Sequence, residues 1–346
     1  MKLEEKIGQL FILGFKGESV DQHHPVLSDI KKRNLGGVIL FDRLLAQKKN
    51  QNNIVSPAQV KALTSALQEQ STTPLLIAID QEGGMVRRLK PEAGFPETMD
   101  VWNLGQKDDA TLTSIHAACT AQTLKLLGIN FNLAPVVDLN VYPQNPVIGK
   151  LKRSFSADPK CVVRHAAIWI QEHRKQNILS CIKHFPGHGS SQTDSHLDFT
   201  DISNSWNRDE LIPYKKLIEN NMADSVMLGH LFQKDLDKNL PTSLSSKVVE
   251  NLLRGKLGFH GPVLTDDLQM KAITEMYGLG EAVCLALAAG VDMIIIGNNL
   301  EYDPEFLKRI IPVVLSAVQN NKIPENRIHT AWERIRTMKR LLSPEG

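Results

Sequence analysis

The sequence predicts an α/β protein built as a single (β/α)8 barrel of the TIM type. Short apolar runs typical of buried strands recur at intervals of roughly 30–45 residues, the size of one strand-plus-helix unit. Stretches with helical periodicity lie between most of them, and eight such units favour a closed barrel over an open sheet. The eight expected strands cover residues 10–15, 37–41, 75–79, 132–137, 179–182, 225–228, 262–264 and 293–296.

The helices are predicted from their start signals and from apolar periodicity. Ser56-Pro57-Ala58-Gln59 is a capping box with proline at the first helical position. Asp158 and Pro159 begin another helix. The apolar residues of that helix that share one face are Val162, Ala166, Trp169 and Ile170. Two further helices are expected over residues 281–289 and 324–342.

An open, doubly wound sheet is the alternative fold. That fold would need a glycine-rich phosphate-binding fingerprint after the first strand. Gly14-Phe15-Lys16-Gly17 does not match it, and the sequence has no Walker A motif. No linker rich in Pro, Gly or Ser divides the chain, so one barrel domain over residues 1–346 is expected, without a second β-sandwich domain.

Composition excludes several classes of protein. A net charge of +2 with 23% charged residues is too balanced for a nucleic-acid partner. No apolar run reaches the roughly 18 residues of a membrane span, and the acidic residues of the N-terminus do not fit a signal peptide. The four scattered cysteines suit a reducing compartment. We therefore expect a cytoplasmic monomer that contacts neither membrane nor nucleic acid.

Titratable side chains crowd one segment, residues 183–196. A short apolar run, 178–182, leads directly into it. The segment holds Lys183, His184, His188, Asp194 and His196. Loops carried by a rigid scaffold commonly hold functional residues, so this segment is the first candidate for chemistry.

Asp194 and His196 suit proton transfer. On an extended loop, side chains two residues apart point the same way, so the carboxylate can fix the tautomer of the ring. Histidine titrates near neutral pH, as a group that gives and takes a proton must. The same segment, with His184 and His188, also allows a metal site. Metal ligands usually come from ordered strands or paired helices, so proton transfer is favoured and no metal is expected.

Polar groups also follow most of the expected strands. In a barrel, the carboxyl ends of the strands form the active site. Asp266 stands at such an end and could act as a nucleophile or an electrostatic stabiliser, whereas Asp267 suits a helix N-cap. Asp80, with Arg88 nearby, could bind the hydroxyls of a polyhydroxylated ligand. The strand ends concerned are 42–43, 80–82, 138, 183–184, 229–230, 266–267 and 297–298.

Taken together, these residues resemble glycoside hydrolase family 3, and more narrowly its single-domain bacterial β-N-acetylglucosaminidases (β-hexosaminidases) of peptidoglycan recycling. The most specific block is Lys-His-Phe-Pro-Gly-His-Gly at 183–189, followed by Asp-Ser-His at 194–196. The resemblance runs almost end to end. Its other blocks are residues 8–11, 36–41, 79–84, 132–138, 153–155 and 265–270.

The resemblance implies a role for each of eight residues. Asp266 matches the catalytic nucleophile, His196 the acid/base and Asp194 its dyad partner. The implied reaction is retaining exo-hydrolysis of terminal β-linked N-acetylglucosamine from muropeptides, such as those ending in 1,6-anhydro-N-acetylmuramic acid, without a metal or other cofactor. The residues implied to hold the sugar and its N-acetyl group are Asp80, Arg88, Arg153, Lys183 and His184.

The chain departs from the family pattern at two places. Residues 150–152 separate Ile148-Gly149 from Arg153 and lengthen the loop that carries the arginine, and Met85 stands where relatives often have arginine. Gly187 and Gly189 are expected as hinges that let the loop close over the sugar. Two alternatives stay open: a glycoside phosphorylase with the same residues, and a non-catalytic sugar-binding barrel.

Overall fold

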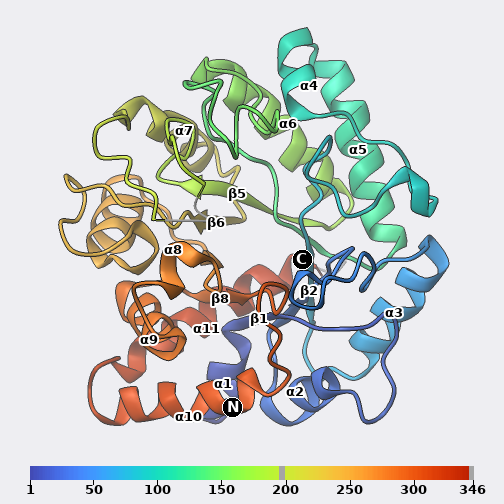
Figure 1. Cartoon of the computed structure of the whole chain (residues 1–346), viewed down its shortest axis with the longest axis vertical. Helices are drawn as coiled ribbons and strands as arrows, with labels where there is room; N and C mark the ends of the chain where they lie inside the picture. Colours follow the sequence, from blue (N-terminus) through green and yellow to red (C-terminus); the bar gives the residue numbers. More distant parts are fainter. Residues whose placement is uncertain (195–198, 343–346) are drawn as a thin grey trace.

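The computed structural model describes residues 1–194 and 199–342 of the chain. Its strands form a closed, all-parallel barrel in the order β1 to β8, which confirms the predicted fold (Figure 1). The strands are β1 (Phe11–Gly14), β2 (Gly37–Ile39), β3 (Leu76–Ile79), β4 (Phe131–Asn132), β5 (Leu179–Phe185), β6 (Ser225–Leu228), β7 (Val263–Asp267) and β8 (Met293–Ile296).

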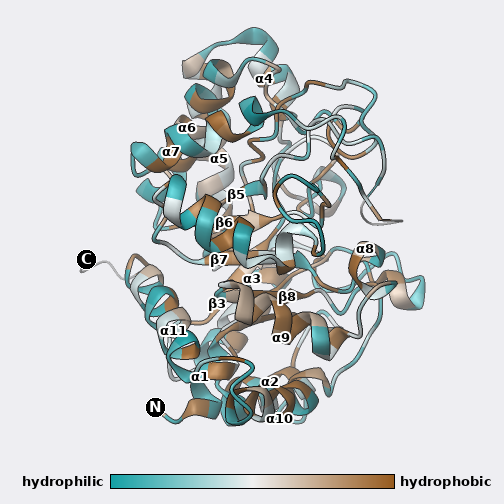
Figure 2. Cartoon of the chain, turned by 90° about the vertical axis from the view of Figure 1, so that its left-hand side faces the viewer, coloured by the Kyte–Doolittle hydropathy of each residue, from teal (hydrophilic) through white to brown (hydrophobic). Residues whose placement is uncertain are grey.

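Helices surround the barrel on the outside. Figure 2 shows hydrophobic residues gathered on the strands, while the helices carry both hydrophobic and hydrophilic residues, as elements with one buried face do. Among the described residues, no helix is long and apolar enough to cross a membrane. The helices are α1 (Leu3–Gln9), α2 (Pro25–Arg33), α3 (Pro57–Glu69), α4 (Val101–Lys107), α5 (Ala110–Leu126), α6 (Pro159–Lys175), α7 (Ile212–Glu219), α8 (Lys271–Thr274), α9 (Leu279–Ala289), α10 (Phe306–Gln319) and α11 (Glu325–Arg340), with a π-helix, η5 (Lys247–Lys256), between β6 and β7.

The predicted helix starts are confirmed by their hydrogen bonds. The Ser56 hydroxyl accepts the backbone N–H of Gln59 at 3.3 Å. The Asp158 carboxylate likewise accepts the N–H of Lys160 at 3.0 Å, and the predicted apolar face of α6 is buried. Both helices therefore begin where their sequence signals indicate.

Six strands differ from their predicted bounds, and in three of them, β4, β5 and β7, an end lies three residues or more from its predicted position. β4 ends at Asn132, five residues early, and the regular pairing is not resumed at Pro135, which has no N–H to donate to the sheet. β5 continues through Lys183 and His184, and β7 through Asp267. Polar side chains that were expected in loops thus stand on rigid strands.

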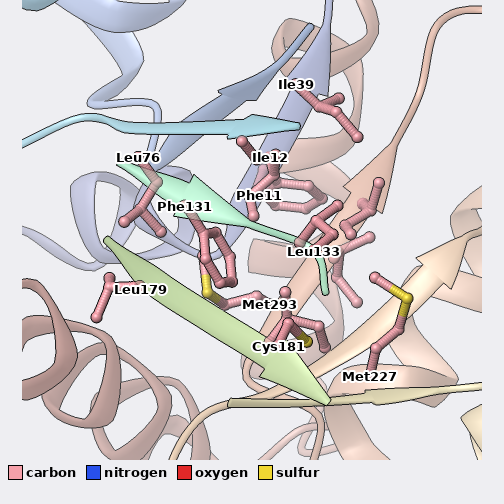
Figure 3. Packing of buried hydrophobic residues seen from close by; sticks show 14 of the residues in the cluster. Phe11, Ile12, Ile39, Leu76, Phe131, Leu133, Leu179, Cys181, Met227 and Met293 are labelled. Carbon is pink, nitrogen blue, oxygen red and sulfur yellow. The ribbon is translucent and has the colours of Figure 1, made fainter. Parts of the chain in front are cut away.

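The interior of the barrel is apolar and densely packed. Figure 3 shows buried side chains converging from most of the strands, among them Phe11, Leu76, Phe131, Cys181 and Met227. Large and branched side chains stacked in layers fill the centre of such barrels, so the interior is a core and not a channel.

Two polar anchors close the end of the barrel where the strands begin. The buried ammonium of Lys339, on α11, donates to the Gln9 side chain and to the Gly36 carbonyl, both at 2.8 Å. Asp292, buried just before β8, pairs with Arg254 and Arg327 at 2.6 Å each. These contacts tie η5 and α11 to this end and leave the opposite end open for a site.

Candidate active site

A cavity of about 410 Å³ opens at the carboxyl ends of the strands. It brings together every described residue that was predicted to act in the site. His196 lies outside the described residues. The predicted residues that line the cavity are Asp80, Arg88, Arg153, Lys183, His184, Asp194 and Asp266.

Two carboxylates and three cations form an ion-pair network in the floor of this cavity. Lys183 Nζ lies 2.8 Å from Asp80 Oδ1 and 2.7 Å from Glu82 Oε1. Arg153 donates to both oxygens of Glu82, through Nε at 2.7 Å and Nη2 at 2.8 Å. Arg88 adds a bond to Asp80 Oδ2 at 3.2 Å. Residues from β5 and from the loops after β3 and β4 are thus locked together.

The network keeps all its members charged. Burial alone would raise the pKa of Asp80, but the charges of Lys183 and Arg88 outweigh it and hold that pKa below its ordinary value. Arg153 and Lys183 overcome burial in the same way and lower the pKa of Glu82. Burial would lower the pKa of Lys183, yet the two carboxylates raise it. Fixed charges of both signs are therefore available to a polar ligand at neutral pH.

Asp138 supports the network from below. It is fully buried, and its Oδ2 lies 2.7 Å from His184 Nδ1. Its Oδ1 accepts the backbone N–H of His188 at 2.9 Å. A carboxylate at Nδ1 leaves His184 Nε2 as an acceptor, which faces Arg153 Nη2 at 3.3 Å. Asp138 thereby orients the ring that lines the cavity.

His188, which had no assigned chemistry, is part of this support. Burial lowers its pKa to about 4, so it is neutral at pH 7 and suits no acid/base role there. Its Nδ1 lies 2.7 Å from the Ser191 hydroxyl, and its ring packs edge-on against His184. Within the described residues, the ligand atoms of His184, His188 and Asp194 do not converge as a metal site requires.

His230 and Asn298, like Asp138, stand at strand ends but do not line the cavity. His230 contacts the Ser243 hydroxyl at 2.8 Å and the Asp267 carbonyl at 3.0 Å, and Asn298 donates to the Gly14 carbonyl at 3.0 Å. Both hold loops in place. A polar residue directly after a strand therefore lines the cavity in some cases, and in others it holds a neighbouring loop in place.

Glu82 and Asp138 are the residues that the predicted site omitted. Both were visible as polar groups at strand ends, and both lie within matching blocks of the family. Their burial, 2% and 0% exposed, is what separates them from ordinary loop carboxylates.

Asp266 and Asp267 have different surroundings at the end of β7. Asp266 lines the cavity, and its Oδ1 accepts the N–H of Asp267 at 2.8 Å. Asp267 is not the helix N-cap that was predicted, because β7 includes it and α8 begins four residues later. Its Oδ1 instead accepts the N–H groups of Gln269 and Gly297, both at 3.0 Å, which ties β7 to the end of β8.

The extension at residues 150–152 is held by backbone hydrogen bonds within its own loop. Lys150 donates its N–H to the Asn145 carbonyl at 2.9 Å, and Lys152 donates to the Gly149 carbonyl at 3.0 Å. The extra residues form a tight turn, and Arg153 still reaches Glu82. Met85 lines the mouth of the cavity with 69% of its surface exposed. An apolar side chain therefore stands at the entrance.

The two glycines expected as hinges are closely packed. A Cβ on Gly189 would lie 1.7 Å from the Leu139 carbonyl oxygen, and one on Gly187 would lie 2.6 Å from Glu210 Cβ. Glu210 Oε2 also accepts the Gly189 N–H at 2.9 Å. The start of the loop is thus closely packed, and the hinge role of Gly187 and Gly189 stays a prediction.

Replacing Glu210 with glutamine is expected to change how stability depends on pH. Burial raises the pKa of Glu210 from 4.5 to about 7, so between these values the folded protein holds a proton that the unfolded chain has lost. The wild type therefore loses stability as pH rises through this window. The variant lacks that loss. The difference between its free energy of unfolding and that of the wild type should therefore shift in its favour by roughly 2–3 kcal/mol between pH 4.5 and 8.

Urea unfolding at several pH values measures this difference. Asp209→Asn, at the exposed neighbouring position, is the matched control and should track the wild type. Parallel pH profiles for Glu210→Gln and the wild type would show that Glu210 does not carry the proton.

A parallel (β/α)8 barrel with carboxylates and buried cations around a cavity at its open end is the architecture of a barrel enzyme that binds a polar substrate. Comparison with known proteins identifies the family. The glycosyl hydrolase family 3 N-terminal domain matches residues 2–338. The chain therefore belongs to glycosyl hydrolase family 3, a family of glycoside hydrolases.

Relatives in this family share much of the chain. A β-hexosaminidase A from Pseudoalteromonas piscicida is 30% identical over 339 residues, which cover 91% of this chain and 55% of that protein. A β-hexosaminidase from Tolumonas auensis is 33% identical over 273 residues, which cover 78% of each protein. This chain thus spans about half the length of the first relative and most of the second.

Solved structures resemble the whole barrel. A family 3 β-N-acetylglucosaminidase from Paenibacillus sp. str. FPU-7 has a TM-score of 0.89 and 35% identity, covering 99% of this chain and 63% of that one. A β-N-acetylhexosaminidase from Beutenbergia cavernae has a TM-score of 0.84 and 29% identity, covering 98% of each chain.

Proposed function

We propose that the chain is a retaining exo-β-N-acetylglucosaminidase that removes terminal β-linked N-acetylglucosamine from muropeptides. One observation carries the proposal: all seven described residues that the resemblance assigns to the site line a single cavity at the open end of the barrel. The names of the relatives, β-hexosaminidase and β-N-acetylglucosaminidase, support the same sugar.

The proposed reaction has two displacements. The Asp266 carboxylate attacks the anomeric carbon and forms a glycosyl ester, while the bond to the leaving oxygen breaks and His196 protonates that oxygen. His196 then takes a proton from water, which attacks the anomeric carbon and releases Asp266. Two inversions restore the β configuration. Asp194 would keep His196 in the tautomer that this cycle needs.

The ion-pair network is proposed to hold the sugar. Asp80 and Lys183 present a carboxylate and an ammonium to the cavity, and neighbouring sugar hydroxyls can donate to the first and accept from the second. Arg88, Arg153 and His184 would complete the sugar site. Because these groups are already paired and at least partly buried, they lose little conformational freedom when a ligand binds.

Muropeptide recycling places the substrate in the cytoplasm, and we propose that location for this protein. The four cysteines are free in the structure, as a reducing compartment keeps them.

Incubation with purified anhydro-muropeptides should release N-acetylglucosamine. If the muropeptides stayed intact while simple aryl β-N-acetylglucosaminides were hydrolysed, the proposed substrate would be wrong and the proposed reaction would stand.

Two alternatives have distinct outcomes in the same assay. A phosphorylase would yield a sugar phosphate and would depend on added phosphate, whereas a hydrolase yields free sugar in either buffer. A non-catalytic sugar-binding barrel would bind N-acetylglucosamine and release nothing from any glycoside.

Replacing His196 with alanine is expected to separate substrates by their leaving groups. Loss of the acid should slow hydrolysis of a phenyl glycoside roughly 10²–10⁴-fold, because that leaving oxygen needs a proton. A dinitrophenyl glycoside needs none, so it should still form the glycosyl-enzyme in a burst that is then hydrolysed slowly. Stopped-flow absorbance measures both steps.

His260→Ala, at an exposed position outside the cavity, is the matched control and should behave as the wild type. If His196→Ala slowed both substrates equally and left hydrolysis of the glycosyl-enzyme unchanged, the acid/base role would be wrong.

A further inference from the structure

We infer that Asp108, Cys161 and His165 form a binding site for a single Zn²⁺ ion, away from the cavity described above. Cys161 and His165 lie one turn apart on α6, and Asp108 follows the last residue of α4. One ligand atom from each residue lies within 4.8 Å of the others. A thiol, an imidazole and a carboxylate are the three side-chain types that zinc takes in proteins.

Both distances to the Asp108 carboxylate fit a tetrahedral ion with little movement. Cys161 Sγ lies 3.8 Å from Asp108 Oδ1, and zinc–ligand bond lengths require about 3.6 Å between such atoms. His165 Nε2 lies 2.8 Å from the same oxygen, where about 3.3 Å is required. The side chain of Asp108 is 51% exposed, so it can shift by this amount, and the ion can enter from its side.

Both ligands on α6 already point at one oxygen of Asp108. The thiol and the ring donate to it, so protons occupy the direction that a metal ion would take. Zinc binding would replace them: the Cys161 thiol proton leaves to solvent, and the His165 proton moves to Nδ1. Water would fill the fourth position.

Thr113 prepares His165 for this change. Its hydroxyl lies 2.7 Å from His165 Nδ1 and donates to the Asp109 carbonyl at 3.1 Å. The hydroxyl oxygen can therefore accept Nδ1–H, which leaves Nε2 unprotonated for the metal. A fixed partner at the second ring nitrogen is typical of metal-binding histidines.

Arg164 competes for the site in the metal-free protein. Its guanidinium contacts the same Asp108 oxygen, but 44% of its side chain is exposed. Displacement into solvent costs little, because exposed ion pairs contribute about 0–1 kcal/mol. The contact also shows that this oxygen attracts a cation.

The ion would brace the wall behind the cavity. The ring of Phe155 stacks on His165 with centroids 5.5 Å apart, and the Phe155 backbone packs against Gly105 of α4. Phe155 lies two residues after Arg153. Zinc would thus join α4 to α6 at the base of the loop that carries the arginine.

Cobalt provides a direct test, because Co²⁺ bound to a thiolate has a charge-transfer band in the near ultraviolet. No cysteine lines the cavity, so Co²⁺ bound there would not produce this band. The full chain is stripped with a chelator and titrated with Co²⁺, and Zn²⁺ affinity is then measured by competition with a chromophoric chelator. We expect one equivalent of Zn²⁺ with a Kd of about 1 μM or tighter. Bound Zn²⁺ should also raise Tm.

The variants assign the site. Cys161→Ser and Asp108→Asn should abolish the cobalt band and weaken Zn²⁺ binding at least roughly 100-fold, and Thr113→Val should weaken it roughly 10–100-fold with the band retained. Cys119→Ser, at an exposed thiol, is the control and should bind as the wild type. Absence of the band in the wild type, or its retention in Cys161→Ser, would overturn the site.

Discussion

Asp266→Asn is expected to reduce kcat on an aryl β-N-acetylglucosaminide at least roughly 10³-fold without unfolding the protein. An amide cannot form the glycosyl ester on which the proposed reaction depends. Asparagine keeps the shape of the side chain and can still accept the Asp267 N–H, now 2.8 Å from Asp266 Oδ1. Initial rates and thermal unfolding, measured on the same preparation, separate a chemical defect from a structural one.

Azide distinguishes the nucleophile from the acid/base. In Asp266→Ala, azide can occupy the space of the lost carboxylate and attack the anomeric carbon directly, so the product should be the α-glycosyl azide. In His196→Ala, azide attacks the glycosyl-enzyme from the opposite face, so the product should be the β-azide. NMR of the products identifies each anomer. Near-normal turnover by Asp266→Asn would show that another residue is the nucleophile.

The barrel could be predicted because its information is local. Each strand is a short apolar run, and each helix has apolar residues at helical spacing. All eight predicted strands lie at or near the positions of the strands in the structure. The predicted strand ends were wrong where polar residues of the site interrupt the apolar run. An apolar run cannot show that β5 continues through Lys183 and His184, since polar residues on a buried strand need partners from elsewhere in the chain.

Those partners could not be derived from spacing. Glu82 and Arg153 are 71 positions apart, and Lys183 and Asp80 are 103 apart. Only the closure of the barrel brings them within 3 Å, so the sequence indicated candidate charges without showing which would pair. The family resemblance implies a sugar-binding set that includes Arg153 but could not show that the guanidinium of this residue also pairs with Glu82.

Glu82→Gln is expected to destabilise the protein by about 3–5 kcal/mol, the usual cost of leaving a buried charge without its partner. Glu82 is 2% exposed and accepts hydrogen bonds from Arg153 and interacts with Lys183. Glutamine fills the same volume but removes the negative charge, so Asp80 alone would face two buried cations. Urea unfolding with linear extrapolation measures the change.

A double variant tests whether the loss is electrostatic. In Glu82→Gln combined with Lys183→Met, one buried cation is gone with its counter-charge, so the combined destabilisation should be less than the sum of the single losses. Glu97→Gln, at an exposed position in the same loop region, should change stability by less than about 0.5 kcal/mol. If Glu82→Gln were as stable as this control, the network would not hold the loops together. Water or a shifted Asp80 would then have to satisfy Arg153 and Lys183, and the rigid sugar site proposed above would lose its physical basis.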